Sequence, residues 1–328
     1  MTDAISHASG TPIIAEANME QARAERPART VTTTQRPRKR GEGGRIALIT
    51  VIIVAALAFV IFPVWYVIVA AFDRVNALGA QRLWPSEPSL DNFRVLWNQE
   101  GGFLFRDWFV NSMVVSVVVS AATVIFTTMA AFAFSRFRFR GRKPLMQTVV
   151  LIQVFPNLLA LAAIYLIITQ VGDVFSGLGL NTRGALILVY LGGILGGNVW
   201  LMKGYLDSIP RDLDESAKLD GASQLEIFWR ILLPLCRPML AVIAVLAFVG
   251  TYGEFLLASV LIPNAESRTL PAGMQAFVAG GGSTGGDYSE RFGAFAAGAL
   301  VASIPPLILF YSLQNWLVRG LTQGSIKG

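Results

Sequence analysis

Residues 46–72 of this chain form the sequence IALITVIIVAALAFVIFPVWYVIVAAF, which contains no charged side chain. A helix needs about 20 mostly apolar residues to cross a bilayer, so this stretch is long enough to span a membrane. The chain contains six such runs, which are Ile46–Phe72, Phe109–Phe134, Leu145–Gly172, Gly184–Met202, Met239–Pro263 and Phe292–Val318. They are too long for barrel strands and show no alternation of polar and apolar residues. The sequence therefore predicts an all-α polytopic membrane protein with six transmembrane helices.

The composition of the whole chain points the same way. Of its 328 residues, 54% are hydrophobic and only 15% are charged, whereas a soluble domain carries about 25% charged residues. The single cysteine, Cys236, excludes an intramolecular disulfide. With one histidine, His7, the chain offers no set of ligands for zinc and no plausible Ser-His-Asp triad. The sequence thus predicts neither a metal site nor an enzyme active site.

Lysine and arginine are distributed unevenly between the segments that join the runs. The tail 1–45, the segments 135–144 and 203–238 and the C-terminus carry 20 of them, whereas the three alternate loops carry 7. The positive-inside rule then places both termini in the cytoplasm. The composition of the tail predicts a disordered, basic cytoplasmic anchor rather than a nucleic-acid-binding arm. A topology determinant beside anionic lipid is the interpretation favoured for Arg136, Arg138, Arg140, Arg142 and Lys143.

Only one of the six runs contains a charged residue, Glu254 in the fifth. An ionised carboxylate at mid-membrane costs about 2.5 kcal/mol or more, so this side chain should face the helix bundle or a wet cavity. Two interpretations follow, and the sequence does not choose between them. Glu254 lies along a substrate path, or it is a hydrogen-bonded clamp between helices.

The cytoplasmic segment 203–238 is longer than a simple turn and predicts two short helices. Pro210 suits a first helical turn, and the acidic residues that follow it suit the positive end of a helix dipole. Asp220-Gly221 is a turn signal, and Ser223 with Glu226 has the spacing of a capping box that starts a second helix. Such a surface helix either docks in the groove of a partner or lies on the bilayer as an amphipathic linker.

Residues 215–238 resemble the EAA motif of ABC importer permeases, approximately EAAxxDGAxxxxxFxxIxLPxxxP. The matching residues are Glu215, Ala217, Asp220, Gly221, Ala222, Phe228, Ile231, Leu233, Pro234 and Pro238. Ser216 replaces the second alanine, and because serine is small, close docking of the helix on a partner should survive. The motif is long and specific, and it favours the docking interpretation of this segment.

The resemblance to sugar permeases of ABC importers covers about residues 46–328 and is strongest to the smaller permease subunits of maltose and maltodextrin importers. It rests on the segments 88–93, 132–139, 179–182, 190–193 and 320–328 in addition to the motif. It implies a type I ABC importer permease fold with six transmembrane helices. The implied parts are a tail (1–45), a first helix with its external loop (46–106), a core domain (107–318) containing the coupling segment 206–238, and a C-terminal tail (319–328).

The resemblance also implies the partners. These are a second, homologous permease, two cytoplasmic ATPase subunits and an extracytoplasmic sugar-binding protein in a bacterial inner membrane. The chain has no Gly-x4-Gly-Lys-Ser/Thr loop, so it should bind no cofactor itself, with ATP and magnesium held by the ATPase subunits. The implied function is coupling of ATP hydrolysis to uptake of maltose or maltodextrin, with trehalose or another oligosaccharide as the alternative. A secondary transporter is disfavoured because the chain shows neither a clear repeat nor several intramembrane charges.

Individual residues take their expected roles from the same resemblance. The ATPase-coupling set is Glu215, Ser216, Ala217, Asp220, Gly221 and Ala222, with Glu215 as the acid that pairs with a basic residue of the ATPase. The C-terminal tail should touch the ATPase dimer through Gly324, Ser325 and Lys327. The external loop 264–291 should face the binding protein through Gly281, Gly282, Asp287 and Tyr288.

Overall fold

The computed structural model describes residues 42–74, 83–99, 102–154, 157–279 and 288–323. This part of the chain forms helices and turns, and no strand occurs in it. The chain divides into two units, Met1–Phe59 and Val60–Gly328. Helix α2 (Glu42–Phe72) begins in the first unit and ends in the second. The packed helices described below belong to the second unit.

Four helices of the described residues are long and apolar enough to cross a membrane. They are α2, α4 (Phe105–Arg136), α7 (Arg183–Ser208) and α14 (Tyr288–Gln323). These helices contain the first, second, fourth and sixth predicted runs. Helix α2 continues through Pro63, and α14 continues through Pro305 and Pro306. Membrane helices tolerate such prolines because neighbouring groups can satisfy the freed carbonyls.

The third predicted run forms two helices rather than one. They are α5 (Arg142–Val154) and α6 (Asn157–Val174). Pro156 lies between them in the sequence, and proline cannot donate the backbone hydrogen bond that an uninterrupted helix requires.

The fifth run is also broken, into α11 (Arg237–Tyr252) and the short α12 (Leu256–Leu261). Helix α11 further combines with the preceding residues Gln224–Leu235 into a candidate span bent by 75°. The described residues therefore contain four continuous candidate spans and a fifth, bent one. The predicted all-helical polytopic membrane fold is confirmed, although two of the six runs are not single helices.

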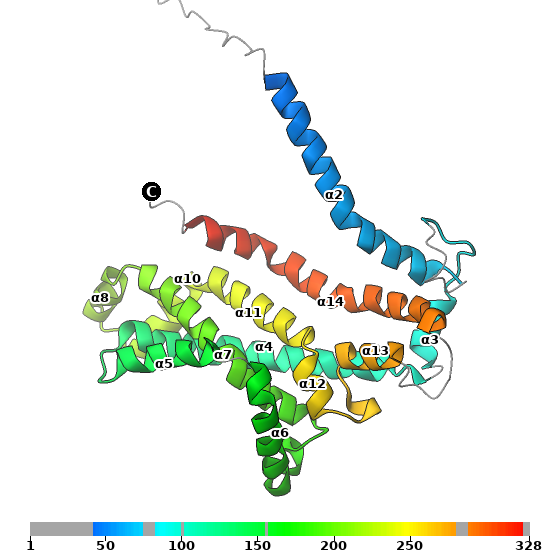
Figure 1. Ribbon diagram of the computed structural model, residues 1–328. Helices are drawn as coiled ribbons and strands as arrows, with labels where there is room; N and C mark the ends of the chain where they lie inside the picture. The colour runs from blue at the N-terminus through cyan, green and yellow to red at the C-terminus, as the bar shows by residue number, and fades with distance from the viewer. Residues whose placement is uncertain (1–41, 75–82, 100–101, 155–156, 280–287, 324–328) are drawn as a thin grey trace, which may run out of the picture. The chain divides into compact units, whose positions relative to one another are not determined.

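Helix α4 packs against α7, α11 and α13 (Leu270–Val278), and Figure 1 shows α4 running alongside α7 and α11. Its buried face is rich in serine and threonine. The Ser120 hydroxyl donates to the Ala244 carbonyl of α11, and Ser112 accepts from the backbone N–H of Leu270. Small polar residues let membrane helices approach closely and hydrogen-bond to one another, which suits the sequence of this helix.

Two buried clusters lie at opposite ends of α4. At its start, Trp108 packs directly on α13, where a Cβ on Gly273 would lie 2.1 Å from the indole ring. At its end, Phe132 packs with Phe228 and Leu232 of the segment 203–238. The second cluster therefore fixes the predicted coupling segment to the helix bundle. The remaining elements are α3 (Asp91–Asn98), η2 (Ser176–Leu178), α8 (Asp212–Leu219), α9 (Gln224–Glu226), η3 (Ile227–Leu232), α10 (Leu233–Leu235) and η4 (Ala265–Ser267).

Candidate functional site

The segment 203–238 forms the predicted helix, turn and second helix. Helix α8 spans Asp212–Leu219 and carries three acidic residues in its first turn. Glu215 and Ser216 are exposed, as is Leu219 at the end of the helix. Ala217 is 8% exposed and belongs to the cluster around Phe228. The exposed face of α8 is thus available to a partner, whereas the small side chain of Ala217 serves packing within the chain.

The turn after α8 is a Schellman motif built on Gly221. Its φ of 84° is in the left-handed region, where glycine carries no penalty from a Cβ atom. The N–H of Gly221 donates to the Lys218 carbonyl at 3.0 Å, and the N–H of Ala222 donates to the Ala217 carbonyl at 2.9 Å. These two bonds close the C-terminus of α8, and half-buried Ala222 packs on the same cluster as Ala217. The turn therefore sets the direction in which the chain leaves α8.

The second helix starts with the predicted capping box. Ser223 accepts at its hydroxyl from the N–H of Glu226, and its own N–H donates to the Glu226 carboxylate at 2.9 Å. The following residues, Ile227–Leu232, form a π-helix before α10 and the bend into α11. Phe228 and Leu232 are buried in the cluster at the end of α4. The π-helical form of this stretch had no signal in the sequence.

A buried ion pair joins α8 to the end of α4. The guanidinium Nε of Arg136 lies 2.7 Å from Oδ2 of Asp214, and the two side chains are 5% and 10% exposed. Arg136 also donates to the Ile209 carbonyl at 3.2 Å. Sequence analysis assigned Arg136 to a lipid-facing topology cluster and Asp214 to the helix dipole. The structure corrects the first interpretation, because the Arg136 side chain is inside the protein and holds the coupling segment.

Further polar contacts join the end of α7 to the same place. The Ser135 hydroxyl donates to Asp207 of α7 at 2.6 Å, and Arg211 donates to the Ser135 carbonyl at 3.1 Å. Asp207 also forms an ion pair with Lys203 one turn earlier in α7. The start of α8 is therefore joined to the end of α4 by the Arg136–Asp214 ion pair and by the bond from Arg211 to Ser135, and α4 is in turn joined to the end of α7.

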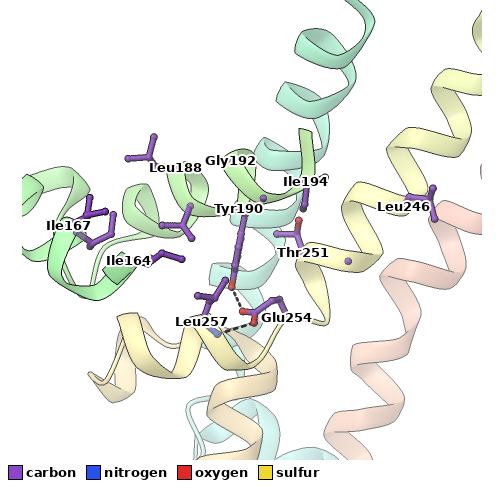
Figure 2. Close-up of a pocket in the computed structure, with 14 residues that line it drawn as sticks. Ile164, Ile167, Leu188, Tyr190, Gly192, Ile194, Leu246, Thr251, Glu254 and Leu257 are labelled. Atoms are coloured by element: carbon purple, nitrogen blue, oxygen red, sulfur yellow. Dashed lines mark hydrogen bonds between the residues drawn. The ribbon is translucent and has the colours of Figure 1, made fainter. Parts of the chain in front are cut away.

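Glu254 occupies the break between α11 and α12. One carboxylate oxygen accepts from the N–H of Leu257 at 2.8 Å. The other accepts from the Tyr190 hydroxyl of α7 at 2.6 Å and from the N–H of Ala258 at 3.1 Å. Figure 2 shows Glu254 between Tyr190 and Leu257. The carboxylate thus caps α12 and links it to α7, as the clamp interpretation requires.

Glu254 also lines a cavity of about 530 Å³. Its walls are mostly aliphatic, with Ile164 and Ile168 from α6 and Leu188 from α7, and Thr251 also lines it (Figure 2). A carboxylate has about four acceptor positions, and three are occupied by the bonds described above. One acceptor position is left for a molecule that enters the cavity.

Most of the other predicted contact residues lie outside the described part of the chain. These are Gly324, Ser325 and Lys327 of the C-terminal tail and Gly281, Gly282 and Asp287 of the external loop. Tyr288 is the first residue of α14. Their expected contacts with the ATPase and with the binding protein stay predictions.

Comparison with known proteins identifies the family. The family model described as "Binding-protein-dependent transport system inner membrane component" matches residues 123–323, which include the segment 206–238. The chain belongs to this family. It is therefore a membrane permease subunit of an ABC importer, and ATP hydrolysis is the task of a separate ATPase subunit.

Two curated relatives align with this permease over most of its length. The galactooligosaccharides transport system permease protein GanQ of Bacillus subtilis (strain 168) is 40% identical over 282 residues, covering 86% of this chain and 95% of GanQ. The maltose/maltodextrin transport system permease protein MalG of Vibrio vulnificus (strain YJ016) is 38% identical over 287 residues. The alignment covers 84% of this chain and 93% of that MalG.

A solved structure supports the fold of the permease. It is a chain of a bacterial ABC transporter involved in the import of the acidic polysaccharide alginate, with a TM-score of 0.69 and 21% sequence identity. The match covers 85% of this chain and 98% of that chain. At this identity the likeness concerns the fold alone, and it agrees with the predicted importer permease architecture.

Proposed function

We propose that this permease forms one half of the translocation pathway of an oligosaccharide importer in a bacterial inner membrane. Its partners would be a second homologous permease, two cytoplasmic ATPase subunits that hold ATP and magnesium, and an extracytoplasmic sugar-binding protein. The observation that carries the proposal is helix α8, an acidic helix with an exposed face whose Asp214 forms a buried ion pair with Arg136 at the end of α4. Closure of the ATPase subunits would move α8, and the spans would then alternate between inward and outward access as rigid bodies.

The proposed substrate is a maltodextrin. The family relatives include permeases named for maltose and maltodextrin and one named for galactooligosaccharides, so the galactose-linked oligomers are the direct alternative. Trehalose is a further alternative. Uptake into proteoliposomes that contain the complete importer, with each sugar offered at the same concentration, distinguishes these classes. A preference for galactooligosaccharides or trehalose over maltodextrins would refute the substrate assignment but not the importer function.

Glu215→Ala should reduce sugar-stimulated ATPase activity of the assembled importer at least about tenfold. Glu215 is exposed on α8 and matches the acid of the EAA motif, so we infer that it pairs with a basic residue of the ATPase. Truncating one partner of a desolvated interfacial ion pair costs about 2–5 kcal/mol, and tenfold corresponds to about 1.4 kcal/mol. The measurement is ATP hydrolysis by the reconstituted complex with and without sugar-loaded binding protein.

The matched control for this experiment is Asp173→Ala, which removes an exposed carboxylate from α6, away from the coupling segment. It should retain wild-type stimulation. The membrane orientation is checked on the same helix in cells that lack the ATPase subunits. There, Ser216→Cys should resist a membrane-impermeant thiol reagent in intact cells and react after permeabilisation. The native Cys236 is buried and should not interfere. Normal stimulation of Glu215→Ala, or labelling of Ser216→Cys from outside, contradicts the proposed coupling role of α8.

We also propose that the cavity beside Glu254 lies along the substrate path. Glu254→Gln keeps the size of the side chain but replaces an acceptor by a donor, so a sugar hydroxyl would lose its partner. Losing one such hydrogen bond costs about 0.5–1.5 kcal/mol, so the sugar concentration for half-maximal uptake should rise about threefold or more. Tyr190→Phe is the matched control, because it removes one clamp bond and leaves the carboxylate in place. If both variants lower thermal stability equally and neither changes the concentration dependence, Glu254 is a clamp only.

A further inference from the structure

A basic cavity lies where the α4–α5 turn meets the cytoplasmic end of α7. The turn passes through Gly141, whose φ is 88°, and α5 begins at Arg142. The cavity has a volume of about 400 Å³ and is lined by Arg142, Lys143, Met146 and Gln147 of α5 and by Lys203 of α7. The arginine-rich cluster of the sequence therefore separates into three parts. Arg136 forms the ion pair to α8, Arg138 and Arg140 are exposed outside the cavity, and Arg142 and Lys143 line it.

The cavity carries an excess of positive charge. Three cationic side chains line it. Asp207 is the acidic residue that faces them, since it pairs with Lys203 and lies within electrostatic reach of Arg142. Helix α5 has no acidic residue in its first turn. Its N-terminal backbone dipole therefore adds to the positive potential rather than being neutralised by a side chain. An anion with one or two negative charges would balance the site.

The surroundings of the cavity indicate that this anion belongs to a lipid. Further along α5, the side chains of Leu145, Leu151 and Ile152 are 51%, 70% and 64% exposed. The helix thus passes from a cationic start to an apolar surface, which matches the order of headgroup and acyl chain in a membrane leaflet. Met146 adds an apolar wall to the cavity itself. Free phosphate would use the charges but not the neighbouring apolar surface.

We propose that Arg142, Lys143 and Lys203 bind the phosphate of an anionic phospholipid, such as phosphatidylglycerol, in the cytoplasmic leaflet. Basic pockets between membrane helices on this side are suited to such headgroups. The site would also be linked to the end of α4, because Lys203 pairs with Asp207, and Asp207 accepts a hydrogen bond from Ser135 of α4. A bound headgroup would therefore hold the cytoplasmic ends of α5 and α7 together beside the start of α8.

The test uses the permease in its assembled importer, purified in a neutral detergent. Thermal stability is measured while phosphatidylglycerol, phosphatidylcholine or inorganic phosphate is titrated in. Phosphatidylglycerol should raise the melting temperature of the wild type, whereas the other two should not. In the double variant Arg142→Gln/Lys143→Gln, the phosphatidylglycerol concentration that gives half of this rise should increase about tenfold or more, because each basic residue near a lipid surface contributes substantially to attraction.

The matched control is Arg138→Gln/Arg140→Gln, which removes the same charge from exposed positions of the same turn outside the cavity. It should respond to phosphatidylglycerol as the wild type does. If the response to phosphatidylglycerol weakens equally in both double variants, the lipid is attracted by charge non-specifically, and the proposed site is wrong. A rise with inorganic phosphate equal to that with phosphatidylglycerol would overturn the lipid assignment. If the double variant elutes abnormally, Lys143→Gln alone replaces it, and a wild-type response of that variant counts against the proposal.

Discussion

Asp214→Asn should lower the stability of the segment 206–238 by about 3–5 kcal/mol. The change keeps the shape of the side chain but removes its charge, so the Arg136 guanidinium would stay buried without a counter-charge. Removing one partner of a buried ion pair costs more free energy than the intact pair contributes to stability. The reason is that the remaining charge stays out of water without a counter-charge. Limited proteolysis of residues 203–238 and thermal unfolding of the purified importer measure the loss.

Two further variants separate the buried pair from a general charge effect. Arg230 pairs with Glu226 at 3.7 Å, and its side chain is 79% exposed. Because exposed pairs contribute less than about 1 kcal/mol, Arg230→Gln should change stability little. The double variant Arg136→Met/Asp214→Leu removes both charges and should recover much of the stability lost in Asp214→Asn. If Asp214→Asn is no less stable than Arg230→Gln, the pair does not hold the coupling segment in place.

The sequence predicted those features that depend on local patterns. Apolar length located the membrane runs, and the spacing of Ser223 and Glu226 located the start of the second helix in the segment 203–238. The Asp220-Gly221 signal located the turn, which the structure builds with a left-handed glycine. Each of these features depends on residues within a few positions of one another, so a single sequence carries the information.

Contacts between residues far apart in the chain could not be predicted from local sequence patterns. Arg136 and Asp214 each had a sufficient local explanation, as a topology charge and as a partner of the helix dipole. Only the fold brings them together. Ala217 was assigned to a partner surface by its motif, yet it packs inside the chain. Glu254 was noted as one charge within a run predicted to be continuous, but the break there and the bonds of Glu254 to Tyr190 and to the start of α12 needed the structure.

Gly221→Val should uncouple the importer while leaving the permease inserted in the membrane. The φ of 84° at this position costs a β-branched residue about 1–3 kcal/mol, so the Schellman turn would open and α8 would change direction. A Cβ at this position meets no atom within 4 Å, so the cost comes from the backbone conformation rather than from a clash. Because α8 must present Glu215 at a fixed angle, sugar-stimulated ATPase activity should fall about tenfold or more.

Replacements that tolerate a positive φ distinguish this cause from a simple loss of glycine. Gly221→Asn should retain most of the stimulation, because asparagine adopts the left-handed region more readily than other residues with a side chain. Gly221→Asp should fall between the two, since it adds a negative charge beside Asp220 at the negative end of the α8 dipole. Gly204→Ala, at a glycine of α7 with open space around it, should behave as the wild type. The valine, asparagine and aspartate variants could instead reduce sugar-stimulated ATPase activity equally. In that case the left-handed conformation of this turn does not set the position of α8.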